Sequence, residues 1–375
     1  MRIFKVSDAY SEYIDNVYAG NVNLRFKTFY EQQKFFFDDA FPDMSWTPNI
    51  ADSNVEIFET ILNCEYLQKS WKPTIDFGGN WQLEILIDQI KDFKPDVCYL
   101  SPTYYFTCSM IDYIKQETRL KFIVLGYDGV LRQNLDDFKG YDLILTCSRF
   151  ISEFYDNADL KTYTLEFGFD ESILSRIKKT EKTRNVCFSG SLYNGIHNSR
   201  SNLIKYLLSK NVDIDVFTQP NPLISATLFK RRNISRILNN HDLLDFISDY
   251  RIALKRKEPV FGINMFETYA ESKISINMHG DKIDFAANVR LFEITGVGSC
   301  MLTDWKKNIE EIFIPDKEIV TFCSKEEAHD KIKYLLKNEK VREKIAVAGQ
   351  QRTLNEYTLK KRMAGFIQYL QKNFF

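Results

Sequence analysis

Short apolar runs alternate with helix-like segments over the first 170 residues of this 375-residue chain. Runs of this length and composition are typical of strands that are buried on both faces of a parallel sheet. Parallel strands need crossover connections, so the alternation predicts a doubly wound α/β domain. The predicted strands are 2–6, 97–101, 122–125, 143–147 and 163–165, and the predicted helices between them are 83–93, 111–117 and 149–155.

A second α/β unit is predicted after the polar segment 178–184, which is the best candidate for a linker. A strand, a small-residue turn, a helix and another strand follow, and this order predicts a βαβ unit. These elements are expected at 185–188, 189–191, 199–210 and 212–217. The sequence therefore predicts two doubly wound domains in tandem.

The turn of this βαβ unit has the residue types of a phosphate-binding loop. Gly190 and Ser191 would let a diphosphate approach the backbone, and Arg200 lies in the first turn of the following helix. His197, in the same loop, is a further candidate for phosphate contact. A lone glycine after a strand is common in α/β proteins, so a surface role for Arg200 stays open.

A second phosphate-binding pattern lies between residues 288 and 304. Asn288 is expected to cap a helix that continues through Val289 and ends at Gly296. The start of this helix and Arg290 would face phosphate, while Glu293 could accept hydrogen bonds from ribose hydroxyls. The alternative is a solvated pair between Arg290 and Glu293, which are three positions apart.

Residues 272 to about 362 resemble the C-terminal domain of CgeB-like glycosyltransferases, which are relatives of the retaining transferases of family 4. Each matching piece is short, but their order and spacing together are fairly specific. The whole stretch is about a quarter of the chain, and the matching pieces lie at 272–280, 288–293, 302–304, 319–322 and 348–354.

The resemblance implies the GT-B fold, in which two Rossmann-like domains face each other across a cleft. Residues 1–170 would form the acceptor domain and residues 184–355 the nucleotide-sugar donor domain. The last helix, at about 356–375, would pack back on the first domain, because apolar positions 363, 366, 367 and 370 give it a face to bury. The implied activity is sugar transfer, with retention of anomeric configuration and without a metal.

Catalytic candidates lie at the ends of predicted strands. His279, followed by Gly280, comes after the strand 274–277, where a neutral imidazole could donate to a phosphate or a sugar hydroxyl. Asp8 and Asp128 follow strands of the first domain, and each is either a catalytic base or a helix cap.

This chain departs from the family 4 pattern at one position. Those enzymes carry two glutamates eight positions apart, but the position eight before Glu293 is Phe285, and the nearest acid is Asp284. Asp284 and the backbone of Ala286 and Ala287 are therefore the candidates for holding the sugar. The stereochemical outcome stays open between retention and inversion.

Composition excludes several other classes. Lys+Arg 50 against Asp+Glu 51 gives a formal charge of -1, so nothing indicates a nucleic-acid partner. No apolar run reaches the ~18 residues of a membrane span, which makes a cytoplasmic protein the expectation. The seven cysteines lack a C-x-x-C pair and are expected to be reduced core residues. No Asp-x-Asp pair ends a predicted strand, so no metal and no separate cofactor are expected.

The expected partners are a UDP, GDP or dTDP sugar as donor and a saccharide or lipid-linked glycan as acceptor, as in synthesis of a bacterial surface polysaccharide. Basic clusters at 230–232 and 255–257 suggest peripheral contact with the inner face of an anionic membrane, and a solvated surface is the alternative. Two other functions stay open: a nucleotide-sugar 2-epimerase, and a carbohydrate-binding or scaffold protein without catalysis.

Overall fold

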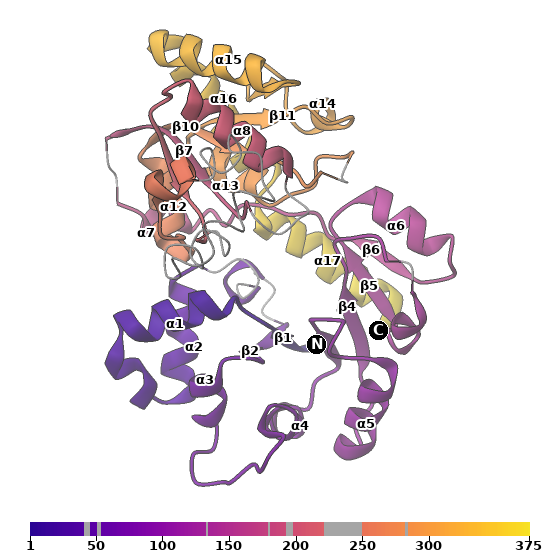
Figure 1. Ribbon diagram of the computed structural model, residues 1–375. Coiled ribbons are helices and arrows are strands. Elements are labelled where there is room, and N and C mark those ends of the chain that lie inside the picture. Colours follow the sequence, from indigo (N-terminus) through magenta and orange to yellow (C-terminus); the bar gives the residue numbers. More distant parts are fainter. Residues whose placement is uncertain are drawn as a thin grey trace, which may run out of the picture. The chain divides into compact units, whose positions relative to one another are not determined.

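The computed structural model describes residues 1–40, 46–50, 54–132, 134–178, 181–192, 198–220, 250–281 and 284–375 (Figure 1). The chain forms two compact units. The first contains Met1–Asp170 and Leu359–Phe375, and the second contains Glu171–Thr358.

The linker predicted at 178–184 is wrong, because the chain enters the second unit at Glu171. Its polar side chains make contacts inside that unit. Lys182 Nζ donates to the carbonyl oxygens of Ala270, Ser272 and Gly298 at 3.2, 3.2 and 2.9 Å. Burial lowers the pKa of Lys182. The segment is thus tied to the second unit by Lys182, although Lys178, Glu181 and Thr183 are exposed.

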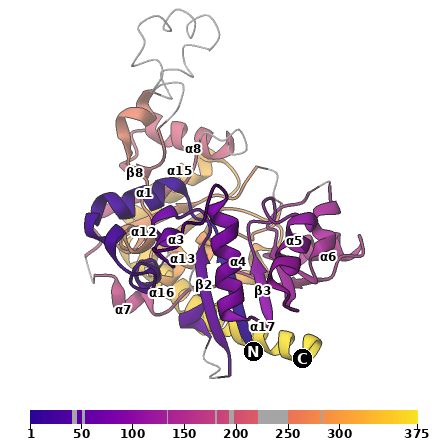
Figure 2. The same cartoon turned by 90° about the horizontal axis from the view of Figure 1, so that it is seen from below.

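The first unit contains a parallel six-stranded sheet in the order β2-β1-β3-β4-β5-β6. Helices of the crossover connections cover it, and Figure 2 shows α4, which connects β2 to β3. The strands are β1 (Arg2–Ser7), β2 (Glu56–Ile61), β3 (Val97–Leu100), β4 (Ile123–Tyr127), β5 (Leu143–Thr146) and β6 (Thr162–Thr164). The helices are α1 (Ser11–Gly20), η1 (Val22–Phe26), α2 (Phe29–Asp38), η3 (Thr47–Asn49), α3 (Glu65–Lys69), α4 (Trp81–Phe93), α5 (Cys108–Thr118), η4 (Asp136–Gly140), α6 (Arg149–Asp156) and α17 (Leu359–Phe374).

The last helix, α17, is part of this first unit. Its buried residues join a core cluster that includes Ile3 of β1, Leu125 of β4 and Leu143 of β5. The Phe366 ring also contacts Trp46, with ring centroids 5.6 Å apart. The apolar face consists of Met363, Phe366, Ile367 and Leu370.

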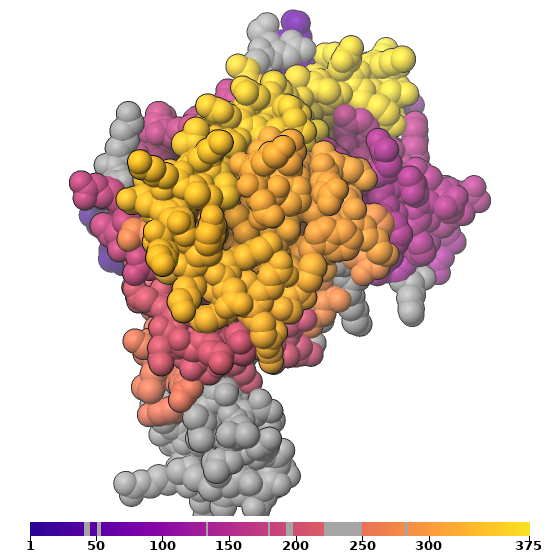
Figure 3. Space-filling model, turned by 90° about the horizontal axis from the view of Figure 1, so that it is seen from above, coloured from indigo at the N-terminus to yellow at the C-terminus, as the bar shows by residue number. Residues whose placement is uncertain are grey.

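The second unit also contains a parallel six-stranded sheet, in the order β12-β11-β10-β7-β8-β9. Figure 3 shows the face of this unit that α15 and α16 form, in orange to yellow. The strands are β7 (Arg184–Ser189), β8 (Ile214–Phe217), β9 (Arg256–Lys257), β10 (Ser272–Asn277), β11 (Cys300–Asp304) and β12 (Val320–Phe322). The helices are α7 (Ile173–Arg176), α8 (Asn198–Ser209), α12 (Gly262–Ala270), α13 (Arg290–Gly296), α14 (Ile309–Ile312), α15 (Lys325–Lys337) and α16 (Glu339–Glu356).

All seven cysteines are free thiols, but the prediction that they are core residues is wrong for Cys323, which is exposed, and for Cys108, which is half-buried. Cys98, Cys147, Cys187 and Cys300 are buried, and burial raises the pKa of each of these thiols, so they behave as small apolar core residues. Within the described ranges, no helix is both long and apolar enough to cross a bilayer.

The strand β2 was missed because its sequence, EIFETI, carries two glutamates. One of them, Glu59, is 2% exposed and pairs with Lys5 of the neighbouring strand β1, which is 1% exposed. The Lys5 Nζ lies 3.2 Å from Glu59 Oε2, and the backbone N–H of Thr47 donates to Glu59 Oε1 at 2.6 Å. A buried charge needs such a partner, so these two positions depend on each other.

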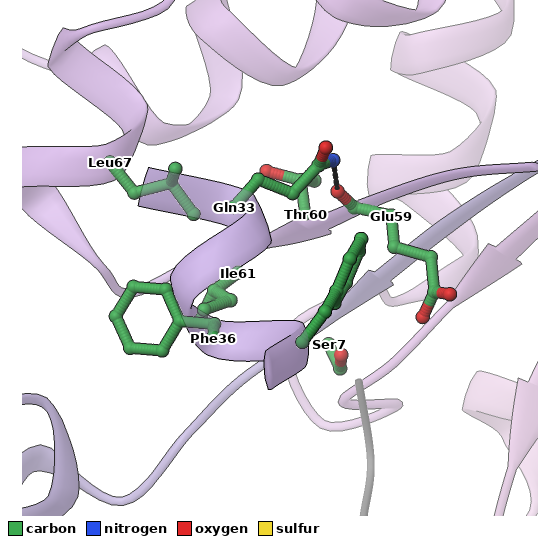
Figure 4. A pocket seen from close by; sticks show the side chains of 8 residues that line it. Ser7, Gln33, Phe36, Glu59, Thr60, Ile61 and Leu67 are labelled. Atoms are coloured by element: carbon green, nitrogen blue, oxygen red, sulfur yellow. Dashed lines mark hydrogen bonds between the residues drawn. The ribbon is translucent and has the colours of Figure 1, made fainter. Parts of the chain in front are cut away.

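A small pocket beside β2 shows how α2 is attached to the sheet (Figure 4). Gln33 of α2 donates its side-chain amide to the backbone carbonyl of Glu59. Phe36 of the same helix is 1% exposed. The buried ion pair and the α2 contact therefore meet at the same point of β2.

Replacing Lys5 by Met should destabilise the protein by about 3 to 5 kcal/mol, because Glu59 would remain buried without its cation. The change is measured by urea unfolding of the full chain. Lys5→Met/Glu59→Gln should regain part of the loss, since the uncharged amide still accepts from Thr47. The control is Lys34→Met, which removes an exposed pair worth at most ~1 kcal/mol. If Lys5→Met costs no more than Lys34→Met, the buried pair does not stabilise this unit.

Candidate functional site

Three adjacent strands of the second unit end at one edge of the sheet. β10 pairs with β7 on one side and with β11 on the other, and all three run parallel. The three strands end at Ser189, Asn277 and Asp304. The residues that follow these three positions are therefore brought together. Ligands of open α/β sheets bind at such an edge.

Arg200 of α8 reaches across this edge. Its Nε and Nη2 donate to the backbone carbonyl of Met278 at 3.1 and 2.7 Å. Nη1 lies beside the β7 turn, 3.8 Å from where a Cβ on Gly190 would stand. No carboxylate of the described residues lies within ion-pair distance of Arg200. Arg200 is thus half-buried and bonded to the backbone of a neighbouring strand end, which distinguishes it from a fully solvated surface charge.

A second guanidinium, that of Arg290, lies close enough to influence Arg200. Burial and then the positive charge of Arg290 lower the pKa of Arg200, against the opposing charges of Asp304 and Asp281. Two cations held this close repel each other, and an anion between them would relieve the repulsion. Two guanidinium groups therefore meet at this edge of the sheet, with the carboxylates of Asp304 and Asp281 nearby.

Arg290 and Glu293 form the ion pair that was the alternative to contacts with a nucleotide, but only Arg290 is partly exposed and the Glu293 carboxylate is buried. The Arg290 Nη1 lies 2.5 Å from Glu293 Oε2, and the Glu293 side chain is 2% exposed. The neighbouring Tyr269, on α12, is fully buried, and burial raises the pKa of its phenol far above the ordinary value. Glu293 thus sits within the site and not on an exposed helix face.

Asn288 does not cap α13, contrary to the prediction. Val289 occupies the N-cap position and makes no capping contact through its side chain. The Asn288 amide instead donates to Asn277 Oδ1 at 2.8 Å, and Asn277 donates to Thr303 Oγ1 at 3.0 Å. This outcome has a physical reason: Asn277, at the end of β10, offers a buried acceptor that the sequence pattern does not reveal. The network ties the start of α13 to β10 and β11.

His279 is held by Asp304, the last residue of β11. Its Nδ1 and its backbone N–H lie 2.8 and 3.0 Å from the same oxygen, Asp304 Oδ1. Lys306 Nζ lies 3.3 Å from Asp304 Oδ2. Burial alone would raise the pKa of Asp304, but the hydrogen bonds from His279 and the charge of Lys306 lower it. The sequence motif containing Asp304 was noted, but its role in fixing the histidine was not.

The His279 ring is fully buried, which differs from the open strand end expected from the sequence. With Nδ1–H donated to Asp304, Nε2 of a neutral imidazole is an acceptor. Among the described residues this Nε2 has no hydrogen-bond partner. The His279 ring therefore keeps one acceptor atom, Nε2, that no described residue uses.

The start of α8 is occupied by a carboxylate of the chain itself. Asp281 Oδ2 accepts from the backbone N–H of Asn198 at 2.8 Å, and Asp281 Oδ1 accepts from that of Ser199 at 3.2 Å. Asp281 follows Gly280 and was not singled out in the sequence. Ser191 is partly exposed in the β7 turn, and His197 lies outside the described residues.

Asp284, proposed as a substitute for the missing glutamate, points away from these groups. Its side chain is 69% exposed and pairs with Lys307 at 3.0 Å. Phe285 stands where family 4 has the glutamate. The backbone of Ala286 is held on both sides by Asn308, at 2.6 and 3.1 Å. Neither an exposed ion pair nor this clamped loop suits Asp284 to hold a sugar.

The two acids of the first unit are engaged, but neither caps a helix. Asp8 accepts from the Tyr104 hydroxyl at 2.9 Å. Asp128 is 2% exposed, accepts from the Val130 N–H at 2.9 Å and lies 2.5 Å from Arg132 Nε. Burial raises the pKa of Asp128, and these contacts offset only part of the effect. The helix-cap alternative is therefore wrong for both acids.

Residues 225–368 match the protein family described as "Glycosyl transferase-like". A comparison with curated protein sequences finds no significant match. The structure is similar to Anabaena Alr3699/HepE in complex with UDP-glucose, with a TM-score of 0.60 and 11% identity over 99% of this chain and 100% of that chain.

Two further solved structures cover the whole chain. A glycosyltransferase from Rickettsia africae ESF-5 aligns with a TM-score of 0.54 and 11% identity, over 99% of this chain and 98% of that chain. A Listeria monocytogenes protein whose description names a UDP-N-acetylglucosamine 2-epimerase aligns with a TM-score of 0.51 and 12% identity, over 100% and 96%. At these identities the likeness concerns the fold, and the chain has the GT-B fold.

The site predicts an acid-sensitive contribution to stability. The folded pKa of Asp304 is lowered, so its contribution is complete above the ordinary aspartate pKa of about 3.9 and is lost as the pH falls through the folded value. Asp304→Asn should therefore destabilise the protein at pH 6, and the difference from wild type should shrink below about pH 4. Urea unfolding at several pH values measures this difference.

The matched control is Asp330→Asn, which changes an aspartate that is 79% exposed in the same unit. It should leave stability nearly unchanged at every pH. If the cost of Asp304→Asn is the same at pH 6 and pH 3, the carboxylate form of Asp304 is not what holds His279.

Proposed function

We propose that this protein is a glycosyltransferase that moves a sugar from a nucleotide-sugar donor to a saccharide or glycoconjugate acceptor. The observation that carries the proposal is the pair of guanidinium groups, Arg200 and Arg290, at the carboxyl edge of the second sheet. The match of residues 225–368 to a glycosyl transferase-like family supports it, as does the likeness to a protein solved with UDP-glucose.

The donor diphosphate would lie between Arg200 and Arg290. During transfer the bond between the sugar's anomeric carbon and the phosphate oxygen breaks, and the acceptor oxygen forms the new bond. The leaving diphosphate gains negative charge, which the two cations stabilise without a metal. Glu293 would accept hydrogen bonds from the ribose. The remaining donor contacts would come from Gly190, Ser191, His197, His279, Gly280, Asn288 and Val289.

His279 would contribute through its Nε2. Asp304 fixes the ring, so a sugar hydroxyl that reaches Nε2 could donate to it. Because the ring is buried, this contact requires the chain around residues 279–281 to rearrange when the donor binds. His279 is thus proposed to orient the donor sugar.

We propose retention of anomeric configuration, in which the departing phosphate oxygen takes the proton of the acceptor hydroxyl, so that no base from the enzyme is needed. Asp128 is already paired with Arg132, and Asp8 already accepts from Tyr104, which fits a reaction in which neither must take a proton. In an inverting reaction one of these two acids would receive the proton of the acceptor hydroxyl. The first unit would be the acceptor domain and the second the donor domain.

The acceptor is proposed to be a growing polysaccharide or lipid-linked glycan, met in the cytoplasm. Membrane contact through 255–257 has weak support, because Arg256 pairs with Glu258 and Lys257 pairs with Asp215. The other basic cluster, 230–232, lies outside the described residues. An anionic membrane surface would therefore find little unpaired charge on the described cluster.

A nucleotide-sugar 2-epimerase is the second candidate, favoured by the likeness to the Listeria protein. Such an enzyme would change the donor sugar without any acceptor. The Arg200 and Arg290 pair fits both functions, because both bind a nucleoside diphosphate. Product analysis separates them.

Incubation with UDP-, GDP- and dTDP-sugars in excess EDTA should release nucleoside diphosphate from one donor, slowly to water and faster with a saccharide acceptor. The two guanidinium groups would replace a metal in balancing the leaving group. Chromatography of the products measures release, transfer and epimerisation together. Epimerised donor without release would favour the epimerase, and activity that returns only with Mn²⁺ would overturn the metal-free reaction.

A further inference from the structure

A groove in the first unit lies between the segment before α2 and the segment around α3. Figure 1 shows where α2 and α3 lie. It encloses about 600 Å³, within the range of ~300 to 1,000 Å³ of ligand sites in proteins. None of the residues discussed so far as site candidates lines it. Its size and separate lining indicate a binding site of its own.

Aromatic side chains form the walls of this groove. Tyr30 is 60% exposed and Tyr66 is 46% exposed. The Trp71 ring stands beside Tyr30, with centroids 6.3 Å apart at 66°. Trp71 is fixed from behind, since it packs on Phe58 at 5.5 Å and donates its Nε1–H to Asp88 at 2.7 Å. The groove therefore has two exposed tyrosine rings beside a half-buried tryptophan that its contacts hold in place.

The charges of the groove leave one cation uncompensated. Lys69 pairs with Glu65 at 2.7 Å, and Lys27 pairs with Glu31 at 3.4 Å. The Arg25 guanidinium lies 5.3 Å from the centre of the Tyr66 ring. Its Nε has no hydrogen-bond partner, and no carboxylate pairs with it, within the part of the chain that the structure describes.

We propose that this groove binds an anionic saccharide. Pyranose rings would stack on Tyr30, Tyr66 and Trp71, because the apolar face of a sugar packs well on an aromatic ring. A carboxylate or phosphate on the saccharide would accept hydrogen bonds from Arg25. Resting on the proposed function, the groove would hold part of an acceptor glycan away from its reacting end.

The binding test uses three probes of equal length with the full chain: hexagalacturonate, neutral maltohexaose and hexaglutamate. Titration calorimetry should show hexagalacturonate binding about tenfold more tightly than maltohexaose, since only the former can pair with Arg25. Hexaglutamate should bind more weakly than hexagalacturonate, because it lacks rings to stack. If hexaglutamate binds as tightly as hexagalacturonate, the groove recognises negative charge alone, and the saccharide proposal is wrong.

Three variants locate the binding. Tyr30→Ala and Tyr66→Ala should each weaken hexagalacturonate binding by about fivefold or more. Arg25→Met should remove the preference over maltohexaose. The control Tyr113→Ala changes a tyrosine that is 46% exposed on α5 and should bind like wild type. If the groove variants bind like Tyr113→Ala, or if hexagalacturonate does not bind, the groove is not a saccharide site.

The outcome is independent of the proposed transferase activity. Binding that these variants weaken, in a protein that turns over no nucleotide sugar, would support the groove and contradict the transferase. Turnover of a nucleotide sugar without saccharide binding would support the transferase and contradict the groove.

Discussion

The hydrogen bonds from Arg200 to the carbonyl oxygen of Met278 determine where positive charge lies in the second unit. A neutral acceptor orients the guanidinium without cancelling its charge, whereas a carboxylate partner would have done both. Arg290 approaches from α13 on the other side and is itself oriented by Glu293. Arg200 therefore keeps a charge that no carboxylate of the described residues offsets, whereas the charge of Arg290 is shared with Glu293. In the proposed reaction the two guanidinium groups would stabilise the leaving diphosphate together.

The strands around that edge make the arrangement rigid. Asn277, Thr303 and Asn288 connect β10, β11 and α13 through side-chain hydrogen bonds. Asp304 continues the connection by holding His279 through two hydrogen bonds to one oxygen. Such preorganisation would place the charge of Arg200 before the substrate arrives. The proposed contact with His279 Nε2 differs, because the buried ring becomes accessible only when residues 279–281 rearrange.

The sequence predicted much of the fold, because buried parallel strands are short and apolar. The five strands predicted in the first unit are all present, and β2 was missed because Glu59 is buried with Lys5. A pairing between residues 54 positions apart leaves no local pattern. The same reason explains the linker error, where Lys182 looked like a solvated residue but is half-buried and donates to three carbonyl groups.

The sequence named many residues that lie at the candidate site, but it did not predict most of their contacts. Spacing alone predicted the Arg290 and Glu293 pair, because helical geometry brings such positions together. The partners of Asn288, His279 and Arg200 come from other strands, and only the sheet order brings them close. The contact of Asp281 with the start of α8 could not be predicted for the same reason, since Asp281 lies 83 residues from Asn198.

Calorimetric titration of UDP, GDP and dTDP into wild type and Arg200→Met is the most direct measurement. Removing a charged hydrogen-bond donor should raise the dissociation constant of the nucleotide that binds by about tenfold or more. Lys210→Met removes one exposed positive charge next to the last residue of the same helix and should change it less than about twofold. Equal affinity of wild type and a folded Arg200→Met protein would contradict an anion site at the edge of the second sheet.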